Sequence, residues 1–230
     1  MANSEQHPSH PVFAAVYDRI NKGAEENLVK EHREYLAADL HGMVLDLGAG
    51  TGAMFPYFKS AIKSNPSLDL HAIEPDPHMR KRAVQKAREF DLDIEIQPNG
   101  AQTLPYADAS FDVVIASLVF CTIPKTQTAL DEVARILKPS GEFRFLEHVH
   151  ADGVVGRVQD IVNPVWRRTI AGCNLNRKTV ATFRSDDRFK VSELDEIAFG
   201  IPPVKPFMRG TLTRKEDAVD SDAHTYCQRR

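Results

Sequence analysis

Short apolar runs of the kind that form buried strands alternate along this chain with stretches in which apolar residues recur every three or four positions. The second spacing puts apolar residues on one face of a helix, whereas a short run fits a strand covered on both sides. Alternation of the two predicts an α/β domain with a parallel sheet. The predicted strands are 43–47, 68–73, 92–96, 111–117 and 142–147, and the helices between them are 53–63, 79–90 and 125–137.

The regions outside this core have their own patterns. Two helices are predicted over about 11–40, before the first strand, and two more strands over 189–199 and 207–213. We expect one domain over 1–215, in which about 151–185 form an inserted segment near the substrate. Residues 1–11 are polar and predicted to be disordered, and residues 216–230 have little to bury and are predicted to form a flexible tail.

Composition excludes several classes of partner. A net charge of -3 and a pI of about 6.3 give no bulk attraction to nucleic acid or to an anionic membrane. No run approaches the roughly 20 apolar residues of a membrane span. The three cysteines, Cys121, Cys173 and Cys227, are odd in number and far apart, which argues against a disulfide framework and for a reducing compartment. We therefore expect a soluble, cytoplasmic monomer or homodimer whose partner is a small molecule.

The first predicted strand ends in a turn with glycines at alternate positions, Gly48, Gly50 and Gly52. Ligands bind outside the carboxyl ends of parallel strands, so bare backbone at this point is suited to hold a cofactor. The dinucleotide fingerprint G-x-G-x-x-G places its third glycine one residue later, which disfavours a nicotinamide oxidoreductase. Taken alone, the stretch could also be an ordinary strand-turn-helix connection with permissive glycines.

The pattern Asp46-x-Gly48-x-Gly50-x-Gly52 resembles the first motif of the class I methyltransferases that use S-adenosylmethionine. Leu104-Pro105, Phe111-Asp112 and Leu137-Lys138-Pro139-x-Gly141 follow in the order of that family, so the resemblance covers roughly residues 40–150. It implies a Rossmann-like three-layer sandwich with a mostly parallel seven-stranded sheet that ends in an antiparallel C-terminal hairpin. It also implies S-adenosylmethionine as cofactor and S-adenosylhomocysteine as product.

The resemblance assigns the cofactor contacts. Asp46 is expected to help hold the ammonium group, and the glycine turn the methionine end. Many relatives carry an acid at the position of Gly100, so adenine recognition here is expected to use backbone at 100–101 and the side chain of residue 102. The predicted cofactor-binding residues are Tyr17, Asp46, Gly48, Ala49, Gly50, Gly52, Glu74, Pro75, Gly100, Ala101, Gln102, Ser117 and Leu118.

Two of these assignments have alternatives. Glu74, at the end of the second strand, is placed to accept hydrogen bonds from ribose hydroxyls. It could instead be an acid at a helix N-terminus, but Asp76 fits that role better because it directly precedes Pro77. Tyr17, with Asp18, resembles the entry helix of the quinone-pathway methyltransferases, and it could equally be an aromatic residue that packs helices together.

A second resemblance is narrower. Phe145-Leu146-Glu147-His148-Val149, Asn163-Pro164-Val165-Trp166 and Gly172-Cys173-Asn174-Leu175-Asn176-Arg177 resemble the family of mammalian membrane-associated thiol S-methyltransferases and their microbial relatives. A small thiol is thus the suggested methyl acceptor. We expect the chain to depart from that family in having no N-terminal membrane anchor, and it carries Ala171 where the mammalian members have an acid. A quinone precursor or a phospholipid amine as acceptor stays open, as does a cofactor-binding protein without turnover.

Candidate catalytic residues follow the fifth strand. His148 titrates near neutral pH and is the preferred general base, although it could instead hydrogen-bond loop backbone. Glu147 and Asn174 are the other predicted catalytic residues, and Asn174 could alternatively cap a helix. Cys173 is predicted to be a small core residue, because direct methyl transfer needs no covalent cysteine. His148 and His150 could form half of a metal site, but no third ligand stands at a suitable spacing, so we predict no metal.

Overall fold

The computed structural model describes residues 8–15, 29–197 and 202–216, and these contain a seven-stranded sheet of order β3-β2-β1-β4-β5-β7-β6. The first five strands pair in parallel, and β7 runs antiparallel to both β5 and β6. The predicted Rossmann-like α/β fold with an antiparallel C-terminal hairpin is therefore confirmed. The strands are β1 (Met43–Leu47), β2 (Asp69–Ile73), β3 (Glu95–Gln97), β4 (Phe111–Ser117), β5 (Leu137–His148), β6 (Phe189–Ile197) and β7 (Phe207–Arg214).

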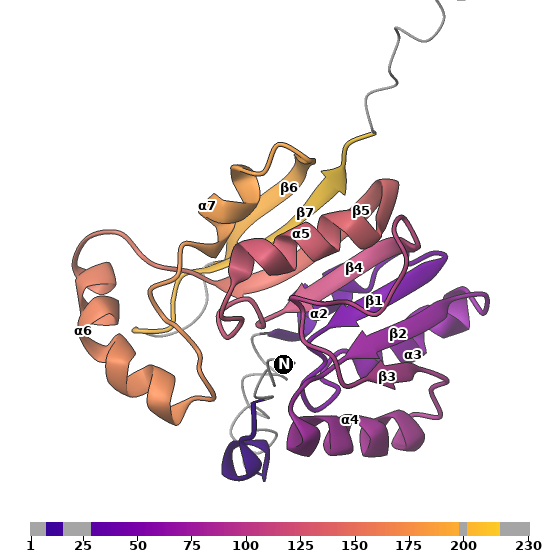
Figure 1. Ribbon diagram of the computed structural model, residues 1–230, viewed down its shortest axis with the longest axis horizontal. Coiled ribbons are helices and arrows are strands. Elements are labelled where there is room, and N and C mark those ends of the chain that lie inside the picture. The colour runs from indigo at the N-terminus through magenta and orange to yellow at the C-terminus, as the bar shows by residue number, and fades with distance from the viewer. Residues whose placement is uncertain (1–7, 16–28, 198–201, 217–230) are drawn as a thin grey trace, which may run out of the picture.

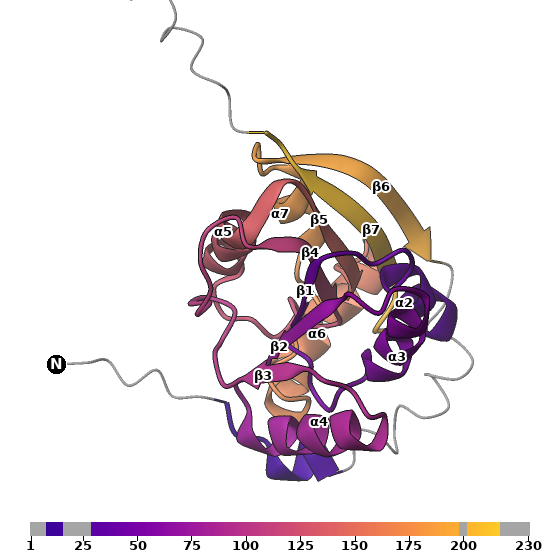
Figure 2. The ribbon, with the colours of Figure 1, turned by 90° about the vertical axis from the view of Figure 1, so that its right-hand side faces the viewer.

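Helices cover both faces of this sheet. One face carries α5 and α7, and the other carries α2, α3 and α4, as Figures 1 and 2 show. Successive side chains of a strand point to opposite faces, so Leu45 and Leu47 pack on the side of α5 while Val44 packs on the side of α3. The helices are α2 (Lys30–Leu36), α3 (Phe55–Ser64), α4 (Pro77–Glu89), α5 (Thr126–Ile136), α6 (Gly153–Thr169) and α7 (Thr179–Arg184).

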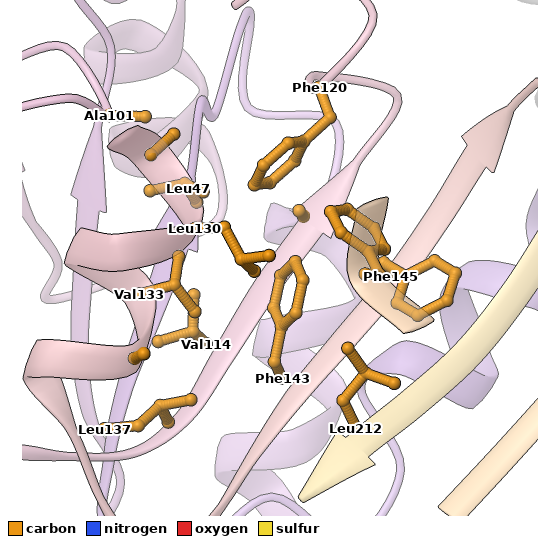
Figure 3. Close-up of a cluster of buried hydrophobic side chains, with 14 of the residues drawn as sticks. Leu47, Ala101, Val114, Phe120, Leu130, Val133, Leu137, Phe143, Phe145 and Leu212 are labelled. Atoms are coloured by element: carbon orange, nitrogen blue, oxygen red, sulfur yellow. The ribbon is translucent and has the colours of Figure 1, made fainter. Parts of the chain in front are cut away.

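An aromatic cluster fills the space between β5 and α7. The ring of Phe143 lies 5.7 Å from that of Phe120 and 5.1 Å from that of Phe183, centroid to centroid, and 5.9 Å from that of Phe145. All four side chains are at most 1% exposed. Figure 3 shows Phe143 below Phe120, with Phe145 on one side of it and Leu130 of α5 on the other. The cluster fixes the loop after β4, which carries Phe120, against the strand that leads into the candidate site.

Two boundaries differ from the sequence prediction. The third strand is shorter and later than 92–96, because the Leu92 amide donates to the Ala87 carbonyl (2.9 Å) at the end of α4 rather than to the sheet. The fifth strand begins at Leu137, so the predicted stop at 138–141 lies inside it as an irregularity of the pairing with β4. Lys138 Nζ holds that irregularity by donating to both carboxylate oxygens of Asp112 at 2.8 Å.

The regions predicted to surround the core are described in part. Residues 11–15 and α2 are helical, but residues 16–28, which include Tyr17, and the predicted tail from 217 lie outside the described residues. The predicted inserted segment contains α6 and α7, and α6 lies beyond the carboxyl ends of β4 and β5 (Figure 1). No helix among the described residues is long and apolar enough to cross a membrane.

Candidate functional site

The glycine turn after β1 is tied to the end of β2. The amides of Gly48 and Ala49 both donate to the Ile73 carbonyl, at 3.0 and 2.9 Å, and Gly48 has a positive φ of 76°. A Cβ on Gly48 would come within 2.1 Å of Val119 Cγ2, so the loop after β4 packs directly on the turn. Among the described residues, a Cβ on Gly50 would meet only Met79 Cε, at 3.8 Å, so these residues leave the backbone at Gly50 open to a ligand.

Glu74 closes the other side of this turn. Its Oε2 accepts from the Gly50 amide and its Oε1 from the Asp76 amide, both at 2.8 Å. Burial raises the pKa of Glu74 to about 7, although the two amide bonds favour the ionised form. Each oxygen keeps a second acceptor position, which a ribose hydroxyl could use. The Asp76 side chain caps α4 by accepting from the amides of His78 (2.8 Å) and Met79 (3.3 Å), which confirms the helix-capping role predicted for it.

Asp46 lies on β1, behind the turn, and is 2% exposed. Its Oδ2 has no hydrogen-bond partner among the residues that the structure describes. Burial raises the pKa of Asp46 to about 7, while the nearby guanidinium of Arg33 on α2 lowers it and the Glu74 carboxylate raises it further. A buried carboxylate of this kind is suited to receive a cationic group from a ligand. The role of Arg33 has no signal in the sequence, because its helix is not one of the core's crossover helices.

The remaining predicted cofactor residues border the same ends of the strands. The Pro75 carbonyl accepts from Arg80 Nη1 (3.2 Å), and the Leu118 amide donates to the Leu146 carbonyl (2.7 Å). Ala101 is buried and packs near Leu47, as Figure 3 shows. The structure therefore places the predicted residues after β1, β2, β3 and β4 along one edge of the sheet, while Tyr17 lies outside its described part.

Glu147 joins β5 to the loop after β4. It is fully buried, and its Oε1 accepts from the amides of Val119 and Phe120, both at 2.8 Å. Its Oε2 is buried and, within the described ranges, unpartnered. Burial raises the pKa of Glu147 to about 7, against the effects of the Phe120 amide and of His148.

His148 is 4% exposed and contacts a cysteine rather than open solvent. Its Nε2 lies 3.1 Å from Cys173 Sγ. Burial by itself lowers the pKa of His148, but Cys173 and Glu147 outweigh it and the pKa is raised. Interaction with Cys121 and with the His148 ring lowers the pKa of Cys173, whereas interaction with Cys173 and burial raise the pKa of Cys121. Cys173 is buried as predicted, but its sulfur contacts the polar His148 ring and not only apolar side chains.

Asn174 fastens this region to the loop after β4. Its backbone amide and its Nδ2 both donate to the Cys121 carbonyl, at 3.0 and 2.9 Å. The next helix, α7, begins only at Thr179 with Lys178 as its N-cap, so the alternative role of Asn174 as a helix cap is wrong. Arg177 Nη1 donates to the carbonyls of Phe120 and Ile123, which precede and follow Cys121 in the same loop. Sequence reasoning assigned no role to Cys121 or Arg177.

Comparison with known proteins identifies the family. The family described as "Methyltransferase domain" matches residues 45–145. Thiol S-methyltransferase TMT1A of Homo sapiens is 28% identical over 172 residues, which cover 73% of this chain and 68% of that protein. Thiol S-methyltransferase TMT1B of Rattus norvegicus is 30% identical over 167 residues, which cover 70% of this chain and 64% of that protein. This chain belongs to the class I S-adenosylmethionine-dependent methyltransferases.

A solved structure shows the same fold. The methyltransferase matches a SAM dependent methyltransferase from Aquifex aeolicus with a TM-score of 0.58 at 17% identity, over 89% of this chain and 98% of that one. The chain spans about two thirds of the length of the two thiol S-methyltransferases, 68% and 64%. The family therefore establishes the enzyme class and its cofactor, S-adenosylmethionine.

The side chains of this methyltransferase fit that cofactor. Buried oxygen atoms without a partner in the described part of the chain occur at the ends of three neighbouring strands, on Asp46, Ser117 and Glu147. Buried polar atoms are normally paired, so a polar ligand at this edge would satisfy them. Two depressions of the surface lie elsewhere, one of about 550 Å³ along α4 and one of about 800 Å³ between the end of β5, α6 and α7. Neither is lined by the glycine turn, Glu147 or His148.

Proposed function

We propose that this methyltransferase methylates the sulfur of a small thiol. The observation that supports the acceptor most directly is the contact of His148 with Cys173, 25 residues away, beside the Asn174 bonds to Cys121. These residues belong to the segments through which the chain resembles the thiol S-methyltransferases, and two such enzymes are among its relatives. The resembling segments thus lie together, at the edge of the sheet that also carries the glycine turn.

The cofactor contacts in this proposal follow the ends of the strands. Bound S-adenosylmethionine supplies a methyl group on a sulfonium, which is a reactive electrophile with a good leaving group. Asp46 holds the ammonium group, Glu74 accepts from the ribose hydroxyls, and the backbone at Gly50 lies against the methionine part. The loop at 100–102 borders the adenine, and residues 117–118 line the face toward the acceptor.

The acceptor side of the proposal consists of Glu147, His148 and Asn174. A thiol reacts as its thiolate, and a free thiol with a pKa near 8.5 loses its proton far more readily than an alcohol. The protein therefore needs to orient the sulfur and help remove one proton, without strong base catalysis. His148 supplies that help, Glu147 fixes the loop beside it, and the segment 151–185 covers the acceptor.

A turnover assay tests the function. Purified protein is supplied with S-adenosylmethionine and with small thiols, amines or quinols in turn, and S-adenosylhomocysteine is measured. We expect product that depends on the thiol. Product only with quinols or amines would reassign the acceptor, and cofactor binding without product in any arm would indicate a binding protein.

Glu74→Gln is expected to weaken the binding of S-adenosylhomocysteine by about 1–3 kcal/mol, because a charge-assisted acceptor for two ribose hydroxyls is lost. Isothermal titration calorimetry measures the change. Glu89→Gln removes the same charge from an exposed position of α4 and is expected to leave the affinity unchanged. Equal affinity of Glu74→Gln and wild type would show that the ribose lies elsewhere.

His148→Gln is expected to lower the turnover of thiols by about 10-fold or more while the Kd of the cofactor changes little, because His148 acts on the acceptor rather than on S-adenosylmethionine. Steady-state kinetics and calorimetry give the two quantities separately. His78→Gln, at an exposed position of α4, is the matched control. An equal loss of cofactor affinity and turnover would assign His148 to cofactor binding instead.

A further inference from the structure

Three potential metal ligands, two thiol sulfurs and one imidazole nitrogen, come from separate parts of the chain and meet at the end of β5. Cys121 comes from the loop after β4, His148 from β5 itself and Cys173 from the segment after α6. Their ligand atoms all lie within 4.8 Å of one another, and the three residues are 3%, 4% and 8% exposed. His150 does not belong to this group, and its Nε2 lies 3.4 Å from Asp160 Oδ1 instead.

Other bonds hold these three residues in place. The Cys121 carbonyl accepts from the backbone amide and from the Nδ2 of Asn174, which joins the two cysteine segments. Glu147 Oε1 accepts from the amides of Val119 and Phe120, which joins the Cys121 loop to the strand that carries His148. These anchoring bonds use backbone atoms, the Asn174 side-chain amide and the Glu147 carboxylate, not the ligand atoms themselves. The ligand atoms make the contact between His148 Nε2 and Cys173 Sγ and a bond of 3.6 Å from Cys121 Sγ to the Leu118 carbonyl, and a cation would replace both thiol protons.

We propose that Cys121, His148 and Cys173 bind one soft divalent cation of the Zn²⁺ class. Tetrahedral Zn²⁺ with bond lengths of about 2.3 Å to sulfur and about 2.0–2.1 Å to nitrogen holds such ligands roughly 3.5–3.8 Å apart. The 3.1 Å between His148 Nε2 and Cys173 Sγ would have to open by only part of an ångström. Two thiolates and an imidazole select zinc over magnesium or calcium, which prefer oxygen.

Charge in this region suits a divalent cation. Two thiolates would cancel its charge. The Arg177 guanidinium, which interacts electrostatically with Glu147 and with both cysteines, offsets the charge of the buried Glu147 carboxylate. Burial of charge is tolerated when it is paired in this way. The Glu147 carboxylate also orients the loop beside the ligands, as groups around metal ligands commonly do.

Three protein ligands leave a fourth coordination position, which is the pattern of catalytic rather than structural zinc. In the role that rests on the proposed function, the acceptor sulfur takes this position. Its S–H bond breaks, the proton passes to solvent, and a sulfur lone pair binds the cation, so the acceptor is held as a thiolate. His148 would then assist the loss of the acceptor's proton as a ligand of the cation.

Cobalt binding tests the site without any turnover. The full chain is reduced, freed of metal and titrated with Co²⁺ under anaerobic conditions. We expect one cobalt per chain, a thiolate-to-cobalt charge-transfer band in the near ultraviolet, the intense visible bands of tetrahedral coordination, and loss of these bands when Zn²⁺ is added. Absence of the charge-transfer band from the reduced wild-type protein would overturn the proposal. A Cys121–Cys173 disulfide found by mass spectrometry before reduction would then be the alternative reason why the two cysteines lie together.

Variants assign the ligands. Loss of a residue that only supports a metal ligand typically costs roughly 10- to 100-fold in metal affinity. Cys121→Ser and Cys173→Ser each remove a ligand itself, so we expect each to weaken cobalt binding by at least this factor and to reduce the sulfur band. Cys227→Ser removes the third cysteine and is expected to bind cobalt as the wild type does. Circular dichroism and S-adenosylhomocysteine binding show which variants are folded. Cobalt binding by folded Cys121→Ser and Cys173→Ser with wild-type affinity and spectrum would place the metal elsewhere.

The acceptor role is tested apart from the site. If the metal-free enzyme methylates thiols at the full rate, the proposed function stands and the role of the cation in turnover is wrong. If cobalt binds with the expected spectrum but no thiol is methylated, the metal site stands and the proposed acceptor is wrong.

Discussion

Asp46→Asn is expected to weaken S-adenosylmethionine binding roughly 10- to 100-fold at pH 8, since a hydrogen bond to a charged partner contributes about 1.5–3 kcal/mol. The variant keeps the shape of the side chain but removes the negative charge. Asp46 Oδ2 is buried with no partner among the described residues, so little else can compensate the ammonium group of the cofactor. Calorimetry at pH 8 measures the change, and Asp93→Asn, at an exposed position, is the control.

The pH dependence of the same experiment has a definite sign. The pKa of Asp46 in the folded protein is about 7, so the ionised form that attracts an ammonium group is lost as the pH falls below that value. Wild-type affinity should therefore decrease between pH 8 and pH 6, and the decrease should be smaller in Asp46→Asn. Glu74, whose pKa is also about 7, accounts for what remains. Wild-type affinity for the cofactor in Asp46→Asn at pH 8 would remove Asp46 from the ammonium site.

Asp46 also makes the free energy of unfolding of the cofactor-free protein depend on pH. Because the folded pKa of Asp46 lies above its ordinary value of 3.8, its contribution to stability is present below pH 4 and is lost as the pH rises through 7. Asp46→Asn should reduce this fall in the free energy of unfolding. Weaker binding together with unreduced stability at pH 8 would separate a binding role from a folding defect.

Phe143→Ala is expected to lower the free energy of unfolding by about 3–5 kcal/mol, the range for removing a fully buried phenylalanine and leaving a cavity. The side chain is 0% exposed and packs against the rings of Phe120, Phe145, Phe183 and Phe189. Urea denaturation followed by circular dichroism measures the loss. Ile161→Ala, on a residue that is 77% exposed in α6, should change stability by less than about 0.5 kcal/mol.

The same variant is expected to affect the site. Phe120 precedes Cys121 and donates its amide to Glu147 Oε1, so loss of its packing partner loosens the loop that joins β4 to β5. At a temperature where the variant is still folded, its thiol turnover should therefore fall more than its cofactor affinity. A stability loss below about 1 kcal/mol would mean that the cluster in Figure 3 collapses to fill the space.

Features encoded by neighbouring residues could be predicted from the sequence. The alternation of apolar runs and helical spacing predicted the α/β fold, and the motif at Asp46 and its glycines identified the family that the comparisons confirm. The cap of α4 by Asp76 was equally visible, because a cap needs only the residues that directly follow it. The boundary of β3 was wrong because the Leu92 amide bonds to Ala87 in a turn that ends α4, which competes locally with the strand. The boundary of β5 was wrong because Lys138 pairs with Asp112 of β4, a distant contact.

The residues proposed to act on the methyl acceptor show most clearly what the sequence could not predict. From the sequence, His148 was a single candidate base, Cys173 was a core residue, and no third metal ligand stood at a suitable spacing. The fold joins them to Cys121 because β4 and β5 are neighbours in the sheet and the segment after α6 returns to the loop after β4. The sequence by itself determined the fold class, the enzyme family and the cofactor. The surroundings of each reactive side chain were decided by the tertiary structure, because the order of the strands brings distant loops together. Burial then shifts the pKa values of the side chains that these loops carry, and so their charge.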